Sequence, residues 1–463
     1  MRERFFDEKD RNAIGNVKRF LEYENMIPGF LEEAAADPQA VIDKYGFPLT
    51  PEDVSFLPMD PARPRHLEAR YPDSKGGIYA GFVNRKLEHV QMLVRECAPK
   101  EPRFARWREE QMGRCMLDLG PQYSSIIHVP VVFELAKGCS VGCEFCGLNA
   151  GPLRSLFRYT DENAMLWKDI LQRLNDLIGP AAAEATLYFA TEPLDNPDYE
   201  LFMRDFRDIL GNLPQITTAV SARNIERLRP LIKELNDDGR FIYRFSVLSE
   251  EMYHELCRAF TAEELALVEL LPQYEQAPGN HFAVTGRCDD TKDEIPAGGT
   301  ISCVTGFIIN MCEKTVTLST PTWADAAHSE GQIVYGKETF KDGADLQVRM
   351  ERMISEKMKV YIEPDDILCT YPYLKYVKDE GSVRIESEHG TAFVLEVNDD
   401  VNIVEKVFEL VSEGCYTRRE IVTKIIKSSE YPAVQSQYLF YLINRFWSKG
   451  IFVEKGGLHG KEV

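Results

Sequence analysis

The chain has 463 residues, of which 44% are hydrophobic and 28% charged, and its formal net charge at pH 7 is −20. This length suits about three globular domains, and the acidic balance argues against broad nucleic-acid binding, which needs clustered Lys and Arg. We expect neither a membrane span nor a signal peptide, because no apolar stretch reaches ~18 residues and Met1–Asp10 is charged. The 11 cysteines are scattered, which favours a reducing, cytoplasmic location.

Residues 1–57 have the apolar spacing of short helices, with Gly46 as a helix end. The stretch Phe30–Phe47 loosely resembles leader peptides of the nitrogen-fixation-associated and nitrile-hydratase-like types. A capping helical bundle is the alternative, and it is the interpretation we favour.

Residues 58–127 begin with a proline-rich linker from Pro58 to Pro72. The remainder of this region is predicted to be mainly helical, including Tyr79–Arg95 and Pro102–Leu117.

Residues 128–322 alternate between strand-like and helix-like patterns. The predicted strands are Val131–Glu134, Ala185–Ala190, Ile216–Val220, Phe241–Val247, Thr300–Ile309 and Thr315–Ser319. The predicted helices are Glu162–Leu177, Tyr199–Leu210, Asn224–Asn236 and Glu250–Leu271. Repeated units of this kind predict an α/β fold with a parallel sheet, and about six strands suggest a partial (β/α)6 barrel. Active sites of parallel barrels lie at the carboxyl ends of the strands.

A C-x3-C-x2-C motif, formed by Cys139, Cys143 and Cys146, directly follows the first of these strands. Three thiols within eight residues are too close for disulfides between separate elements, so they predict a metal ion or a cluster. A [4Fe–4S] cluster normally takes four protein ligands, and three would leave one iron open. A zinc site completed by His128 or Cys115 is the alternative, although zinc sites usually contain a second cysteine or histidine pair.

The motif, on a loop that leaves a strand, resembles the signature of the radical S-adenosylmethionine (SAM) enzymes. That resemblance implies that the open iron binds the amino and carboxylate groups of SAM and that Phe145 lies against the adenine. The stretch Tyr188–Pro193 is similar to the family's Gly-Gly-Glu-Pro segment, although Ala190 and Thr191 replace the glycines. Glu192 and the backbone of Ala190 and Thr191 would then receive the SAM ammonium group.

Further SAM contacts are implied at the ends of later strands. Ser221 is expected near the ribose, and Ser246 and Arg258 have spacings similar to those in peptide-modifying members of the family. Each hydroxyl taken alone is more often a capping residue.

Residues 380–463 are predicted to form a separate winged-helix-like module, with a hairpin, three helices and a closing strand. DNA binding is one interpretation, but residues 401–463 carry nine Lys and Arg against seven Asp and Glu, which is a poor surface for phosphates. The order of elements resembles the precursor-recognition element of peptide-modifying pathways, where a leader peptide adds a strand to an exposed sheet edge. We favour peptide recognition.

The whole layout resembles the radical SAM peptide epimerases that install D-residues in proteusins of the polytheonamide type. This resemblance implies a ribosomally made precursor peptide as substrate and a reducing partner similar to flavodoxin or ferredoxin. It also implies that Cys369, in a post-barrel segment of residues 323–379, returns a hydrogen atom to the Cα radical. A small buried apolar cysteine is the alternative for Cys369, and Cys303 and Cys312 are the other candidate donors.

Two other classes of function remain open. One is a radical SAM maturase that forms thioether or cyclophane cross-links, which commonly carries auxiliary clusters. No C-x2-C pair follows the barrel, so auxiliary clusters are not expected. The other is a zinc-stabilised regulator whose C-terminal module binds DNA.

Overall fold

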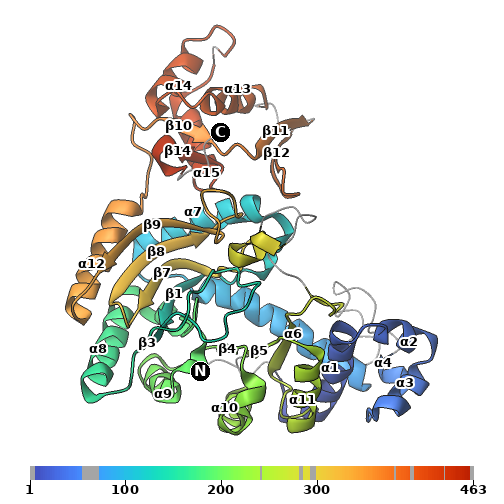
Figure 1. The fold of residues 1–463 in the computed structure, drawn as a ribbon. Coiled ribbons are helices and arrows are strands. Elements are labelled where there is room, and N and C mark those ends of the chain that lie inside the picture. Colours follow the sequence, from blue (N-terminus) through green and yellow to red (C-terminus); the bar gives the residue numbers. More distant parts are fainter. Residues whose placement is uncertain are drawn as a thin grey trace.

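The computed structural model describes residues 6–54, 72–239, 242–280, 285–291, 299–379, 382–396, 401–431 and 433–458. Figure 1 shows a central layer of strands with helices packed around it, a group of short helices near the N-terminus and a C-terminal module above the sheet. The fold is therefore mixed α/β. The predicted linker from Pro58 to Pro72 lies outside the described residues except for Pro72.

The central sheet is built around β1 (Val129–Glu134), which pairs in parallel with β7 (Val304–Asn310). Beyond β7, β8 (Thr315–Pro321) and β9 (Gln332–Thr339) add in antiparallel order. Within the described residues, β9 therefore forms one edge of this sheet.

The other side of β1 carries the rest of the parallel strands. Val132 forms one parallel bridge with Thr186, and a separate parallel sheet contains β4 (Thr217–Thr218), β5 (Tyr243–Val247) and β6 (Val268–Pro272). In the described parts of the chain these strands do not close into a barrel.

Two expectations for this region are wrong. The segment Glu250–Leu271 was expected to be helical throughout, but α11 (Glu250–Ala259) ends early and β6 begins at Val268. The alternating burial of Val268, Glu269 and Leu270 is the strand signal that the helical interpretation missed.

The last predicted strand also differs from the expected parallel series, whereas β7 is parallel to β1 as expected. β7 lies beside the first strand, and β8 returns antiparallel to β7. Only residues 311–314 separate them, whereas a parallel crossover needs a dozen or more residues.

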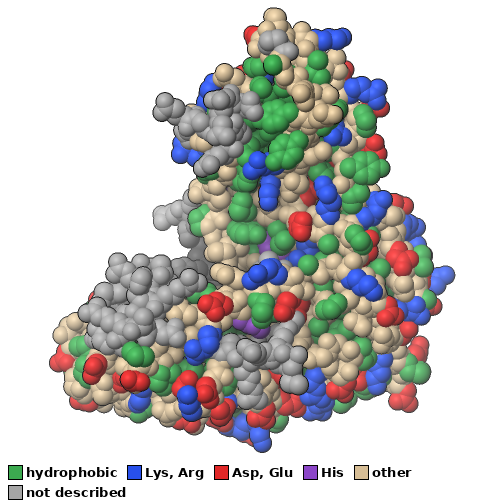
Figure 2. Space-filling view, turned by 180° about the vertical axis from the view of Figure 1, so that it is seen from behind, with side chains coloured by type: hydrophobic (Ala, Val, Ile, Leu, Met, Phe, Trp, Pro, Cys, Tyr) green, Lys and Arg blue, Asp and Glu red, His purple; other side chains and the backbone are tan. Residues whose placement is uncertain are grey.

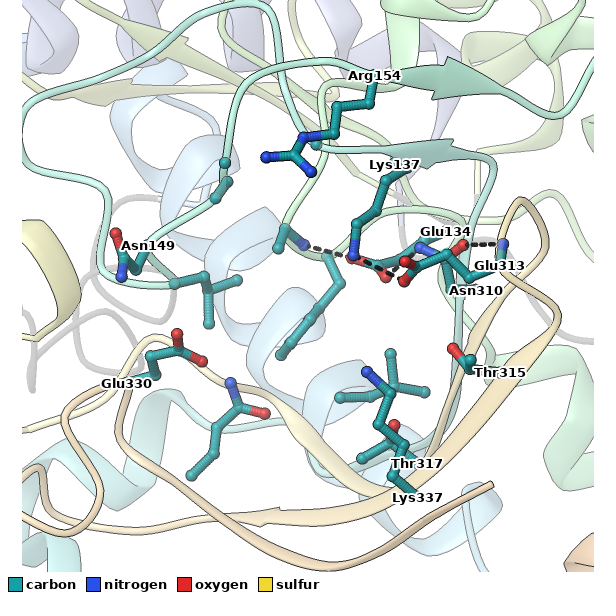
Figure 3. Close-up of a pocket in the computed structure, with 18 of the residues that line it drawn as sticks. Glu134, Lys137, Asn149, Arg154, Asn310, Glu313, Thr315, Thr317, Glu330 and Lys337 are labelled. Atoms are coloured by element: carbon teal, nitrogen blue, oxygen red, sulfur yellow. Dashed lines mark hydrogen bonds and ion pairs between the residues drawn. The ribbon is translucent and has the colours of Figure 1, made fainter. Parts of the chain in front are cut away.

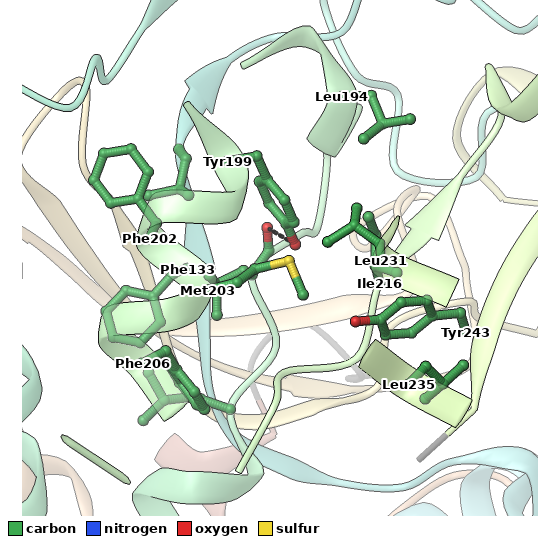
Figure 4. Packing of buried hydrophobic residues seen from close by; sticks show 14 of the residues in the cluster. Phe133, Leu194, Tyr199, Phe202, Met203, Phe206, Ile216, Leu231, Leu235 and Tyr243 are labelled. Atoms are coloured by element: carbon green, nitrogen blue, oxygen red, sulfur yellow. Dashed lines mark hydrogen bonds between the residues drawn. The ribbon is translucent and has the colours of Figure 1, made fainter. Parts of the chain in front are cut away.

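Helices cover the sheets because each has one apolar stripe. They are α8 (Asp161–Ile178), α9 (Tyr199–Leu210), α10 (Ile225–Asp238), α11 and α12 (Gly343–Lys357). On α9, Tyr199, Phe202, Met203 and Phe206 recur at helical spacing and are all buried. Figure 4 shows this stripe facing residues of α10 and of the parallel strands. Each such side chain contributes roughly 1.5–3 kcal/mol to stability when buried.

The N-terminal residues form α1 (Arg11–Met26), α2 (Phe30–Ala36), α3 (Pro38–Tyr45) and α4 (Pro51–Val54), which pack around Phe20 and Phe30. Gly46, with a φ of 68°, ends α3 as expected. The segment that resembles a leader peptide is thus part of a small helical bundle. The long helix α6 (Lys75–Glu96) connects this bundle to the rest of the chain.

The C-terminal module has its own apolar core. Its strands are β10 (Leu368–Thr370), which pairs with β14 (Phe452–Glu454), and β11 (Leu374–Asp379), β12 (Ser382–Ser387) and β13 (Ala392–Glu396), which form an antiparallel sheet. Its helices are α13 (Val401–Ser412), α14 (Arg418–Ile426) and α15 (Ser436–Trp447). Two strands, β10 and β11, precede the expected boundary at residue 380.

The module docks on α7 (Pro102–Leu119) through close backbone contacts. A Cβ atom added at Gly113 would lie 2.5 Å from the Lys449 carbonyl oxygen, and one added at Gly450 would lie 2.5 Å from the Arg114 nitrogen. Glycine is therefore required on both sides of this contact. Among the described helices, none is long and apolar enough to cross a membrane.

Candidate active site

The three motif cysteines lie on a loop that leaves the carboxyl end of β1. The loop begins after β2 (Ala136–Lys137) and ends at β3 (Ser155–Leu156). These two strands pair with each other, which holds the two ends of the loop together. The Cys139 amide donates to the Gly151 carbonyl over 2.9 Å, and the Leu153 amide donates back to the Cys139 carbonyl over 3.2 Å. The loop is therefore fixed at the end of β1, where the sequence predicts an active site.

The three thiols are half-buried. Burial, and then the neighbouring Cys139 and Cys146, raise the pKa of Cys143 to about 11. As the side chains stand, no group of three or more metal-ligating residues in the described parts of the chain is gathered closely enough to hold a single ion. A four-iron cube places each thiolate on a different iron, so its cysteines stand further apart than ligands of one ion. Three thiols on one loop are a donor set that could ligate three irons of such a cluster.

The two residues considered as completing zinc ligands lie elsewhere. His128 precedes β1, so the strand separates it from the cysteine loop by roughly 20 Å at about 3.3 Å per residue. It is buried, its Nδ1 lies 2.7 Å from the Thr305 hydroxyl, and burial lowers its pKa to about 3. Cys115, on α7, donates from its thiol to the Pro321 carbonyl over 3.2 Å. The zinc site built on either residue is wrong.

Arg287, from a distant segment, also supports the cysteine loop, and no pattern in the sequence predicts this contact. Arg287 donates from its guanidinium to the carbonyls of Cys143, over 3.0 Å, and Ala150, over 2.6 Å. Its backbone amide donates to the Cys146 carbonyl over 3.1 Å. Since these contacts join residues about 140 positions apart, no local spacing could have revealed them.

The loop also contacts the segment with the predicted SAM ammonium site. Ser140 donates to the Asp195 carboxylate from its amide over 2.9 Å and from its hydroxyl over 2.5 Å. The Ala190 amide donates to Glu134 Oε1 over 3.0 Å. The two stretches that carry the family resemblance therefore meet at one end of the sheet.

A polar cavity of about 540 Å³ opens beside this junction (Figure 3). Its wall is formed by the cysteine loop, by the ends of β1 and β7 and by β8 and β9. Glu134 Oε2 accepts from Asn310 over 2.9 Å, and Lys137 pairs with Glu313 over 2.7 Å. Burial raises the pKa of Glu134 above its ordinary value. A cavity lined by such charged and amide groups suits a polar substrate.

The residues predicted to contact SAM are not equally well placed to do so. Ala190 lines the cavity, and Phe145 is half-buried on the cysteine loop. Glu192 is buried, and its carboxylate accepts from the Thr218 hydroxyl over 2.7 Å and from the amides of Leu194, over 3.0 Å, and Ala219, over 2.9 Å. Burial raises the pKa of Glu192. In this arrangement Glu192 stabilises the strand ends, and its three hydrogen bonds leave one acceptor site, on Oε2, for a ligand.

The remaining predicted contacts lie along the parallel sheet. Ser221 begins η5 (Ser221–Asn224) after β4, is fully buried and has a hydroxyl without a hydrogen-bond partner among the described residues. Ser246 lies on β5 and is half-buried, and Thr191 is half-buried beside Ala190. Arg258 is exposed on α11, the outer helix that follows β5. Its outward position gives no support to a SAM contact.

The candidate hydrogen donors fall into different parts of the molecule. Cys369 lies on β10 in the core of the C-terminal module, is 6% exposed and donates to the Val453 carbonyl over 3.5 Å. The structure does not bring it to the cysteine loop. Cys303 precedes β7, at the opposite end of the sheet from the loop. Cys312 follows β7 at the same end as the loop, and its thiol donates to the Ser155 carbonyl over 3.6 Å.

No family model matches the chain. A protein of Sinorhizobium fredii named "Uncharacterized protein y4wI" is 33% identical to it over 437 residues, which are 90% of this chain and 83% of the rhizobial one. The chain therefore belongs to the same family as that protein. Among solved structures, BtrN in complex with AdoMet and 2-DOIA is similar to 41% of this chain and 72% of that chain, with a TM-score of 0.30 and 14% identity. A likeness at this level is too remote to carry an argument.

Proposed function

We propose that this protein is a radical SAM enzyme, with Cys139, Cys143 and Cys146 as ligands of a [4Fe–4S] cluster. The observation that carries the proposal is the meeting of the cysteine loop with the Ala190–Asp195 segment beside a polar cavity. When bound, the reduced cluster and SAM would supply a carbon radical that removes a hydrogen atom from a substrate.

The protein's own residues hold and orient the components. Arg287 keeps the cysteine loop closed on itself through the carbonyls of Cys143 and Ala150. Glu134 joins the ends of three strand segments by accepting from Ala190 and Asn310. These contacts preorganise the site, which reduces the cost of ordering it during the reaction.

The substrate we propose is a ribosomally made precursor peptide, and the reaction is conversion of L-residues to D-residues at Cα. The C-terminal module supports this substrate class, because within the described residues β13 is an edge strand and carries the exposed Val394. Figure 2 shows hydrophobic side chains gathered over this module, in the upper part of the view. A groove of about 440 Å³ on the module is lined by Ile403, Tyr431, Val434 and Tyr438, among others. Reducing equivalents would come from a partner similar to flavodoxin or ferredoxin.

Inversion at Cα requires a hydrogen atom to arrive on the face opposite the one from which it was removed. Position favours Cys312 as the donor, because it lies at the loop end of β7 and its neighbour Glu313 lines the cavity. Cys369 could serve only if the substrate reached the core of the C-terminal module or if that core opened.

The reaction in deuterated water tests the epimerase proposal. Since a thiol exchanges its hydrogen with solvent before donating it, each D-residue formed should add one dalton to the peptide. We expect Cys312→Ala to cleave SAM but to form no deuterated D-residue, while Cys369→Ala retains the activity. The opposite pattern would return the donor role to Cys369. A product two daltons lighter and without D-residues would instead show a cross-linking maturase.

A further inference from the structure

A second cavity, of about 530 Å³, lies away from the cysteine loop, where α7, β9 and the end of α12 meet β10 and β14 of the C-terminal module. We call it the junction pocket. Its walls include Trp107 and Glu110 from α7, Tyr335 from β9, and Tyr371 and Glu454 from the module. The proposed radical chemistry uses none of these residues.

Glu110 is the unusual member of this wall. It is 8% exposed, yet no described residue forms a hydrogen bond or an ion pair with its carboxylate. The neighbouring Gln111, in contrast, accepts from Arg114 over 2.9 Å and from the Tyr335 hydroxyl over 2.8 Å. Burial, and then the charge of Glu454, raise the pKa of Glu110 well above its ordinary value. Because Glu110 lines the junction pocket, its carboxyl is open to a molecule that enters the pocket and has no partner among the described residues.

The cations that act on Glu110 are engaged elsewhere. Arg114 pairs with Asp118 over 2.8 Å. Lys359 lies 2.9 Å from Asp366 and 3.5 Å from Glu454. Arg106 also acts on Glu110, but its guanidinium lies over the Trp447 ring, 5.4 Å from the centroid. Glu110 is therefore left for a cation that enters the pocket.

Aromatic rings stand beside this carboxylate. The rings of Trp107 and Tyr335 meet edge to face, with centroids 5.2 Å apart, and Tyr371 adds a third ring to the wall. Aromatic walls bind the methylene stem of a long basic side chain and are attracted to its charge.

The pocket is preformed, since both bodies that build it are fixed to each other. The close contacts of Gly113 with Lys449 and of Gly450 with Arg114 hold α7 against the module one helical turn along from Glu110. A ligand would therefore bind without having to bring the two bodies together.

We propose that the junction pocket binds an aliphatic organic cation, an alkylammonium or guanidinium group, with its charge at Glu110 and its stem against Trp107. The cation could belong to a Lys or Arg side chain of a peptide or to a free diamine. The proposal does not depend on the reaction at the cysteine loop.

The test is a titration of the full chain followed by saturation-transfer NMR. The probes are N-acetyl-lysine methylamide, cadaverine as a free diamine, and N-acetyl-norleucine methylamide, which keeps the stem but lacks the charge. We expect the lysine probe or cadaverine to bind at least about tenfold more tightly than the norleucine probe, because charge-assisted contacts in a partly buried site are strong. The stronger of the two identifies the source of the cation.

The matched variants are Glu110→Gln and Glu109→Gln, which make the same change on one helix, inside the pocket and at an exposed position. Glu110→Gln should lower the affinity for the cationic probe at least about tenfold, and Glu109→Gln should leave this affinity unchanged. Equal binding of the lysine and norleucine probes to the unaltered protein would overturn the proposal without any variant. So would binding of neither cationic probe, or an equal effect of the two variants.

Discussion

Arg287 shows how a single side chain can decide whether the cysteine loop keeps its shape. Its guanidinium binds two loop carbonyls and its amide binds a third. Arg287→Lys retains the charge but cannot reach both carbonyls with a planar fork. We expect this variant to retain less than about half of the iron that the unaltered protein holds after anaerobic reconstitution and desalting. Arg154→Lys, on the cavity wall, is the control and should retain the normal iron content.

Glu24 gives a pH dependence that can be followed without any cofactor. Burial raises its pKa from 4.5 to about 7, and its Oε1 has no hydrogen-bond partner among the described residues. Because the folded state favours the protonated form, this stabilisation is complete below about pH 4.5 and is lost as the pH rises through about 7. With a discount for its exposed part, the loss is about 1–2 kcal/mol.

Thermal unfolding between pH 5 and 8 measures this effect by comparison with Glu24→Gln, which cannot ionise. The melting temperature of the unaltered protein should fall relative to that of the variant as the pH rises. A constant difference between the two proteins across this range would show that Glu24 titrates normally.

The residues of the cysteine loop could be predicted from the sequence because C-x3-C-x2-C is a local pattern. The position of Cys369 could not. Its neighbour Leu368 pairs with Glu454 and Cys369 with Val453 across more than 80 residues, so only the folded module reveals that this thiol is in a core.

Among the elements, the sequence predicted the first strand and α9, because each has a regular local signal. Strand pairing was harder to predict. β7 joins β1 across 170 residues or more, and its pairing includes Gly306, at a φ of 153°, close to the Pro130 carbonyl. Such contacts depend on tertiary structure, which local periodicity does not encode.

The contact between α7 and the C-terminal module makes a stability prediction at this scale. Gly113→Ala would place a methyl group 2.5 Å from the Lys449 carbonyl oxygen, so we expect it to lower the free energy of unfolding by about 1–3 kcal/mol. Gly456→Ala, whose added carbon meets nothing within 4 Å, should have little effect. Urea unfolding of both variants measures this difference in stability. Equal midpoints for the two variants would mean that the contact adjusts to the added methyl group without loss of stability.

The edge strand β13 makes a binding prediction. If a leader peptide adds to this edge, Val394→Asp should weaken precursor binding about tenfold or more and leave SAM cleavage unchanged. Val348→Asp is a matched control, because both valines are 58% exposed and Val348 lies on α12, outside the module. Binding can be measured by fluorescence anisotropy of a labelled precursor. Equal affinities of the two variants would assign the module another partner.

In the molecule as a whole, the fold separates the cysteine loop from the C-terminal module and holds the two in a fixed relation. The cysteine loop and its polar cavity lie at one end of the central sheet, and the C-terminal module docks on α7 through paired glycines. Figure 1 shows α7 between the sheet and this module. A substrate tethered by the module would be presented to the cavity at raised effective concentration. The acidic net charge of −20 argues against broad nucleic-acid binding.

The most direct test of the central claim is SAM cleavage by the anaerobically reconstituted and reduced protein. The account predicts about four iron atoms per chain, as one [4Fe–4S] cluster requires, and release of 5′-deoxyadenosine and methionine. A variant with Cys139, Cys143 and Cys146 all changed to Ala should lose both the iron and the cleavage. Cleavage of SAM at the normal rate by that triple variant, or bound zinc and no cleavage in the unaltered protein, would contradict the account.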